Sequence, residues 1–218
     1  MKSTIFLTEL FKIFQQEWTR GFGMKKLCML FTLIFVFILS SCTANEETKK
    51  KESLLDEYKV MNHYSTVKVK DFIYRIVSEN KEYADNEKIK IYAELEYVGN
   101  EDQVTIYHAA SPFYFDIEEK TRSYDIGYIM NQPLVKTTIV KGKPLREEYI
   151  VGNGGYSGDD PKEYVDFMKT IMETKRLPYG YYILNGRADF YVETVKNGKN
   201  VEIDYNISSS IDFKVNEK

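Results

Sequence analysis

The sequence contains few of the residues that most often carry out catalysis or bind metals. Its 218 residues include two cysteines, Cys28 and Cys42, and two histidines, His63 and His108. Neither histidine has a cysteine, a second histidine or an acidic residue at the spacing of a metal site, and Ser111 lacks the flanking glycines of a nucleophile elbow. We therefore predict no catalytic centre, no metal site and no cofactor, and we interpret His108 as a strand residue at the rim of a sheet.

An excess of basic residues is also missing. The 30 lysines and arginines are outnumbered by 33 aspartates and glutamates, which gives a net charge of −3. Proteins that bind nucleic acid need a basic surface to neutralise phosphates. The composition therefore argues against a nucleic-acid partner.

Long hydrophobic runs are limited to one, which covers 13 uncharged residues at 27–39. Crossing the hydrocarbon core of a bilayer takes about 20 residues, so this run is too short for a comfortable permanent span. Lys25 and Lys26 precede it, and Ser40, Ser41 and Cys42 follow it. A basic start, a short apolar run and small residues are typical of a signal peptide, which we place at 24–41.

The end of this segment, Leu39-Ser40-Ser41-Cys42, resembles the lipobox of bacterial lipoproteins. The resemblance implies cleavage between Ser41 and Cys42, lipidation of Cys42, and attachment to the extracytoplasmic face of the cell membrane. Two acyl chains, at about 0.8 kcal/mol per buried methylene, would hold the protein there permanently. The alternative is an ordinary signal or membrane helix that ends in a cysteine.

Residues 1–23 precede the leader and have two interpretations. Either translation starts at Met24 and they are not made, or they form an extended n-region with an amphipathic helix. Removal of residues 1–41 leaves 25 basic and 31 acidic residues, a net charge of −6. Cys28 leaves with the leader and Cys42 is used for the lipid, so the mature domain has no free thiol and no disulfide.

The mature chain divides into a tether and one domain. Residues 42–65 are polar and charged, with lysines at 49–51, and they predict a flexible tether in which Leu54, Leu55 and Tyr58 begin a short helix. The domain is predicted over 66–218, a length that suits one hydrophobic core.

Alternation of apolar and polar residues makes this domain mostly β. Odd-numbered residues from Ile89 to Tyr97 are apolar and alternate with polar ones, and a turn at 99–102 leads into a return strand. Further alternating runs appear at 113–117, 137–139, 145–151 and 188–192, and Asn197-Gly198 favours a type I′ hairpin turn. Many short strands between turn signals predict an antiparallel β-sandwich.

A helix of about 161–175 interrupts the strands. Asp160-Pro161-Lys162-Glu163 has the elements of a capping box, with Asp160 as the N-cap. Apolar residues at 164, 167, 168, 171 and 172 then follow at helical spacing, and Leu177-Pro178 ends the run.

Three stretches of the domain carry a family resemblance: AELEYVGNEDQVTIYHAASPFYFDI, TTIVKGKPLREEYIV and RLPYGYYILNGRADFYV. Their order and turns resemble the immunoglobulin-like domains of Gram-positive surface lipoproteins and, more loosely, the bacterial intracellular proteinase-inhibitor domain. The resemblance spans about 88–192 and implies an immunoglobulin-like sandwich. The inserted helix and the glycine-rich loop before it depart from the compact members of these families.

Two segments are candidates for binding. Residues 152–160 form a glycine-rich loop in which Gly154, Gly155, Tyr156 and Asp159 are the candidate binding residues. The loop lacks the residues of a phosphate or calcium loop, so a mobile connection is the alternative. The tyrosines of 179–182 either form a platform for a carbohydrate or peptide or pack inside the sandwich.

The sequence as a whole predicts a lipid-anchored, non-enzymatic binding or accessory module of the cell envelope with an envelope protein as its partner. One alternative is an inhibitor or chaperone-like partner of envelope proteases that would act through the loop at 152–160. An enzyme would require a buried pair of acids that the sequence does not reveal.

Overall fold

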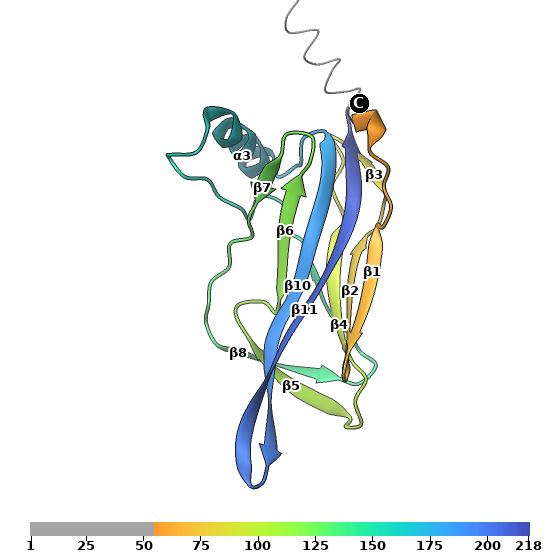
Figure 1. The fold of residues 1–218 in the computed structure, drawn as a ribbon, viewed down its shortest axis with the longest axis vertical. Coiled ribbons are helices and arrows are strands. Elements are labelled where there is room, and N and C mark those ends of the chain that lie inside the picture. The colour runs from red at the N-terminus through yellow and green to blue at the C-terminus, as the bar shows by residue number, and fades with distance from the viewer. Residues whose placement is uncertain (1–54) are drawn as a thin grey trace, which may run out of the picture. The chain divides into compact units, whose positions relative to one another are not determined.

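The computed structural model describes residues 55–218, which form two packed β-sheets and a 13-residue helix (Figure 1). One sheet has the strand order β1-β2-β4-β9. The other has the order β3-β11-β10-β5-β8, and β6 joins β10 and β7 to it. The predicted β-sandwich with an inserted helix is confirmed, and the short β3, which runs parallel to β11, is the one described strand that departs from antiparallel pairing.

The strands have the following bounds: β1 Tyr64–Val69, β2 Phe72–Ser78, β3 Glu82–Ala84, β4 Ile91–Tyr97, β5 Gln103–His108, β6 Phe113–Glu119, β7 Tyr124–Ile126, β8 Val135–Val140, β9 Leu145–Glu148, β10 Gly180–Lys196 and β11 Lys199–Asn216. The helix α3 covers Lys162–Thr174. No helix within 55–218 is long and apolar enough to cross a membrane. The predicted leader 24–41, the cleavage and lipidation residues Ser41 and Cys42, and residues 1–23 lie outside the described residues.

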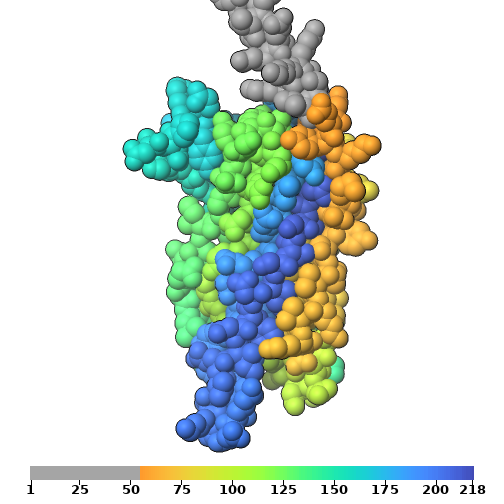
Figure 2. Space-filling view, viewed as in Figure 1, coloured from red at the N-terminus to blue at the C-terminus, as the bar shows by residue number. Residues whose placement is uncertain are grey.

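The β10–β11 hairpin is the longest element pair of the sandwich. Its strands have 17 and 18 residues, and every residue of β10 has a partner on β11. Asn197 and Gly198 join them with φ angles of 53° and 74°, as the predicted type I′ turn requires. The hairpin end projects beyond the other strands (Figure 2).

Alternating burial confirms the predicted strand faces. Ile89, Ile91, Ala93, Leu95 and Tyr97 are all buried, and so are the apolar residues of β6. The prediction that β5 returns beside β4 is wrong, because β5 pairs with β8 and β10 in the other sheet. Alternation shows which side chains face the core, but it does not show to which sheet a strand belongs. Strands of opposite sheets face the same core and therefore carry the same pattern.

The helix is confirmed, but its predicted cap is wrong. Pro161 occupies the N-cap position, without a capping side chain. The Asp160 carboxylate instead accepts a hydrogen bond from the Ser157 N–H at 2.6 Å, inside the preceding loop. Lys175 ends the helix in the left-handed conformation, at φ 55°.

The packed domain begins earlier than the predicted boundary at residue 66. A short helical turn occupies 55–57, and Leu55 is buried. The Tyr58 ring stacks on Tyr181 at 4.5 Å, and the Asp212 carboxylate accepts hydrogen bonds from the main chain of residues 61 and 62 at 2.7 and 2.5 Å. Residues 55–65 therefore belong to the sandwich and not to the tether.

One buried hydroxyl in the core lacks a partner. Tyr74 is fully buried, and its hydroxyl has no hydrogen-bond partner within residues 55–218. Burial raises the pKa of this phenol far above its ordinary value. The absence of a side chain at Gly186 makes room for the hydroxyl end of Tyr74. A Cβ on residue 186 would overlap the Tyr74 hydroxyl and Ile76.

We predict that Tyr74→Phe leaves the free energy of unfolding unchanged or raises it by up to about 1 kcal/mol, because it removes an unsatisfied polar group. Tyr83 is the matched control: it is equally buried, but its hydroxyl bonds Ser78 and the Lys90 carbonyl, both at 2.9 Å. Tyr83→Phe should cost about 1–3 kcal/mol in chemical denaturation. Equal destabilisation by both substitutions would contradict the prediction.

Candidate functional site

The glycine-rich loop is braced against the sandwich. The Asn153 carbonyl accepts a hydrogen bond from the Ile129 N–H at 3.0 Å, and the Asn153 amide donates one to the Ile129 carbonyl at 2.9 Å. A Cβ on Gly154 would lie 2.9 Å from the carbonyl oxygen of Gly127, so this glycine permits close packing. The first half of the loop is thus held in place by contacts, which the glycine content alone did not predict.

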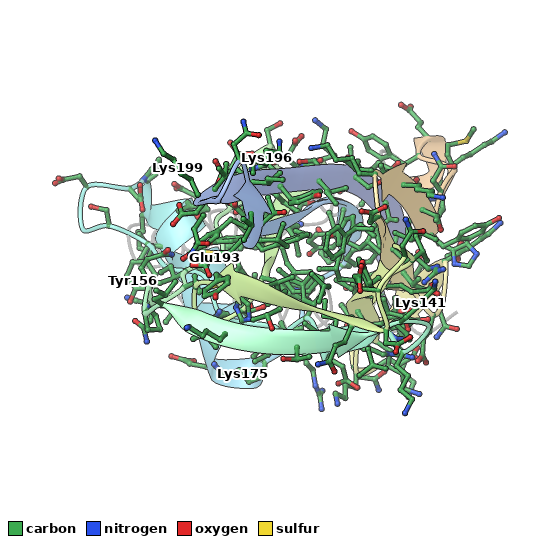
Figure 3. The ribbon with its side chains drawn as sticks, turned by 90° about the horizontal axis from the view of Figure 1, so that it is seen from below. Lys141, Tyr156, Lys175, Glu193, Lys196 and Lys199 are labelled. Atoms are coloured by element: carbon green, nitrogen blue, oxygen red, sulfur yellow. The ribbon has the colours of Figure 1, made fainter. Side chains whose placement is uncertain are left out.

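The predicted binding residues of this loop do not converge on one site. Gly154 packs against residues 126–127 and Met168, and Gly155 packs against Ile129. Tyr156 is instead 41% exposed and has Lys169 over its ring at 5.8 Å. Asp159 is exposed and takes part in a local turn through its N–H. In Figure 3, Tyr156 lies at the edge of the molecule. The loop therefore offers one large exposed side chain and no cluster of binding groups.

Two of the three tyrosines at 179–182 serve packing. Tyr182 is fully buried, stacks on Phe213 at 5.3 Å and donates to the Pro178 carbonyl at 2.5 Å. Tyr181 is also buried and donates to Asp212 at 2.7 Å. The interpretation of this cluster as a surface platform is therefore wrong for its two C-terminal tyrosines.

A buried ion pair supports the same region. Glu119 is fully buried, lies 3.3 Å from Arg122, and accepts the N–H groups of Thr121 and Arg122 at 3.0 and 2.7 Å. The Arg122 guanidinium lies over the rings of Phe167 and Tyr179. Gly180 is required beside this pair, because a Cβ there would lie 2.5 Å from the Glu119 carboxylate. All of the Glu119 contacts are local and structural.

His108 is held as a structural residue, as the sequence predicts. Its Nε2 lies 2.8 Å from the Thr137 hydroxyl, and its Nδ1 lies 2.8 Å from the Ala109 carbonyl. Burial lowers the pKa of this imidazole below its ordinary value. Ser111 accepts the Phe113 N–H at 2.9 Å. Within residues 55–218, no three His, Cys, Asp or Glu side chains gather closely enough to hold a metal ion.

Aromatic and charged groups gather on the outer face of the seven-stranded sheet. Strand β10 pairs with β6 up to residue 188 and with β5 at 191–192, so its neighbour changes at Asp189 and Phe190. An open groove of about 300 Å³ lies at this change of partner. We call it the tyrosine groove, and it is lined by Tyr107, His108, Ala109, Tyr114, Gln132, Pro133, Leu134, Asp189, Phe190, Tyr191 and Asp204.

Strand register builds one wall of the tyrosine groove. Asp204 lies opposite Tyr191, and Tyr191 lies opposite Tyr107 on the next strand. The rings of Tyr107 and Tyr191 are stacked with centroids 4.7 Å apart and planes 6° apart. Lys136 lies 5.0 Å from the Tyr107 ring, and Arg187 lies 4.3 Å from the Tyr114 ring. The faces of the Tyr107 and Tyr114 rings thus attract cationic side chains of the same protein.

Carboxylates surround the stacked tyrosines. The Tyr107 hydroxyl donates to Glu193 at 2.8 Å, and this hydrogen bond raises the pKa of the phenol. Asp189 lies 3.5 Å from Arg187. Within residues 55–218, Glu193, Glu202 and Asp204 form no ion pair with any lysine or arginine. The groove therefore borders an acidic surface on which these three acids are not neutralised by an ion pair.

Sequence reasoning did not find this groove. Its residues come from β5, β6, β10, β11 and the segment before β8, and each is unremarkable in its own strand pattern. The available signal lay in three alternating segments, 103–108, 189–193 and 202–204. Their outward positions include two tyrosines and four acids: Tyr107, Tyr191, Asp189, Glu193, Glu202 and Asp204. Only the register between the strands places these residues side by side.

Comparison with known proteins gives no match: no family model fits the chain, and no curated protein or solved structure is significantly similar to it. The resemblance to immunoglobulin-like lipoprotein domains therefore stays a prediction.

Proposed function

We propose that this protein is a lipid-anchored, non-enzymatic binding module of the cell envelope, and that the tyrosine groove belongs to its binding surface. The anchor is proposed at Cys42, after the leader 24–41. The observation that carries the binding role is the stacked Tyr107–Tyr191 pair in an open groove bordered by acids. Aromatic rings with a few polar groups around a concave surface are typical of binding sites.

The geometry of the described chain is consistent with an outward-facing binding surface. The short helical turn at 55–57, where the described chain begins, and the end of the β10–β11 hairpin lie at opposite ends of the sandwich (Figure 1). A domain tethered through its N-terminal side would therefore direct the hairpin end away from the point of tethering. The tyrosine groove lies on the strands that lead to this end.

A non-enzymatic role is favoured because His108 and the buried Glu119 are already engaged in contacts with neighbouring residues. Both ring nitrogens of His108, the one histidine in the groove, take part in hydrogen bonds to neighbouring residues. The fully buried acid Glu119 is bound to its own turn and to Arg122. Neither group is positioned to exchange a proton with a ligand.

The protease-partner alternative would use the loop at 152–160. Its best observation is the exposure of Tyr156, the one large apolar side chain among the loop glycines. The tyrosine groove presents a stacked pair of rings in a concave surface, whereas the loop presents one exposed ring, so we favour the groove. The two surfaces can be told apart by separate substitutions.

We predict that metabolic labelling with a palmitate analogue marks the full chain in its native host and that Cys42→Ala abolishes the label, since Cys42 is the proposed acylation site. The measurement is in-gel detection of the label on the immunoprecipitated protein. Cys28→Ala is the matched control and should keep the label. Labelling that survives in the Cys42→Ala variant would show that no lipid is attached at this residue.

We also predict that Tyr191→Ala reduces the capture of a specific envelope partner several-fold in a mild crosslinking pull-down, because it removes one ring of the stacked pair. Tyr156→Ala should leave this capture unchanged. Thermal melting of both variants checks that the sandwich is folded. The opposite pattern, with capture lost only in Tyr156→Ala, would place the interface on the loop and would favour the protease-partner role.

A further inference from the structure

One edge of β11 has no neighbouring strand over residues 200–206 within the described chain, and we call this segment the β11 edge. The tight turn makes Lys196 and Lys199 the closing hydrogen-bonded pair of the hairpin. Main-chain groups of residues 201, 203 and 205 therefore point toward β10. Those of residues 200, 202, 204 and 206 point outward.

Bonds farther along the same strand confirm this alternation. The Asp212 N–H donates outward to the Asn62 carbonyl at 2.9 Å, and the Lys214 N–H donates outward to the Lys81 carbonyl at 3.0 Å. Over 200–206 these outward groups have no main-chain partner in residues 55–218. The β11 edge is therefore available for the addition of a strand.

The β11 edge is protected only by acidic charge, which repels an acidic strand but not a basic one. Natural free edges commonly carry charged residues, lysine above all, or proline or a bulge, which prevent pairing with other chains. Residues 200–206 read NVEIDYN, with no lysine and no proline, and they pair with β10 without a bulge. Lys196 and Lys199 are confined to the turn end of the hairpin (Figure 3).

Charge at the β11 edge favours a basic partner. Glu193 and Glu202 lie directly opposite each other as a cross-strand pair, and like charges in this position are destabilising. Asp204 follows on the same face, beside Tyr191 and the tyrosine groove. Neither Glu202 nor Asp204 has an ion-pair partner in the described chain. The like-charged pair lowers the stability of the folded chain, and local rules of this kind are usually broken at functional sites. A cationic ligand would account for it, because both the acids and the faces of the stacked rings attract cations.

We propose that the β11 edge binds an extended peptide segment with lysine or arginine at alternate positions, which adds as a strand beside β11. Main-chain bonds would form with residues 202, 204 and 206. The basic side chains would lie on the outer face over Glu202 and Asp204, close to the tyrosine groove. This inference names a partner class for the proposed binding function and rests on it, but it does not depend on lipidation of Cys42.

The experiment measures binding of a fluorescent nine-residue peptide, alternating lysine and threonine, to the purified full chain by fluorescence anisotropy. We expect saturable binding that weakens with added salt, since exposed charges are screened. A peptide with glutamate in place of lysine should not bind. N-methylation of one alternate set of peptide amides should abolish binding, because it blocks the edge that faces β11, whereas methylation of the other set should be tolerated.

Two protein variants test the two parts of the site. Glu202→Gln with Asp204→Asn should weaken binding about tenfold, in line with the loss of two complementary charges. The control pair, Glu148→Gln with Glu163→Gln, removes two exposed acids elsewhere and should bind like the wild type. Asn206→Pro keeps every charge but removes an outward N–H, and it should abolish binding while the melting temperature stays near that of the wild type.

Three results would overturn the inference: equal binding of the glutamate peptide, equal tolerance of both methylation patterns, or unchanged affinity of the Glu202→Gln, Asp204→Asn variant. If Asn206→Pro unfolds the domain, the methylated peptides and the charge variant still decide the question. If Tyr191→Ala loses its envelope partner while the lysine peptide does not bind the wild type, the binding function stands and the partner class is wrong.

Discussion

The register of the β10–β11 hairpin is the constraint on which the rest of the structure depends. A two-residue turn at Asn197-Gly198, with both residues at positive φ, fixes the first pair of the hairpin and hence all of the following pairs. A slip by one residue would turn every inward side chain of β11 outward. The aromatic core would be lost with it, because Phe190 and Tyr205 stack at 5.0 Å and both contact Phe72 of the opposite sheet.

The candidate site follows from the same register. It places Asp204 beside Tyr191 and Glu193 opposite Glu202, and it leaves the main-chain groups of alternate β11 residues pointing away from β10. The strand neighbour of β10 changes from β6 to β5 at the same level, which opens the tyrosine groove. The groups proposed to bind a ligand thus lie on strands that pack against the core. Little rearrangement of the protein is needed when a ligand binds.

Local chemistry made much of this fold predictable. Alternation identified the buried faces of β4 and β6, and the Asn-Gly dipeptide identified the hairpin turn. Strand partners were not predictable, because β4 and β5 face one core from opposite sheets and therefore share a pattern. The start of the domain was missed for a similar reason: Tyr58 and residues 61–62 are held by Tyr181 and Asp212, which are distant in sequence. The tyrosine groove combines residues from five segments, so its prediction required the register first.

Amide hydrogen exchange along β11 tests the account most directly, since it reads the two edges of one strand residue by residue. The hairpin register predicts slow exchange at Val201, Ile203 and Tyr205, whose N–H groups point to β10, and fast exchange at Glu202, Asp204 and Asn206. Addition of the lysine–threonine peptide should slow exchange in the second set only. Equal protection of both sets in the free protein would show that the outer edge is already covered, and equal lack of protection would show that the hairpin end is not formed. Either result would contradict the account.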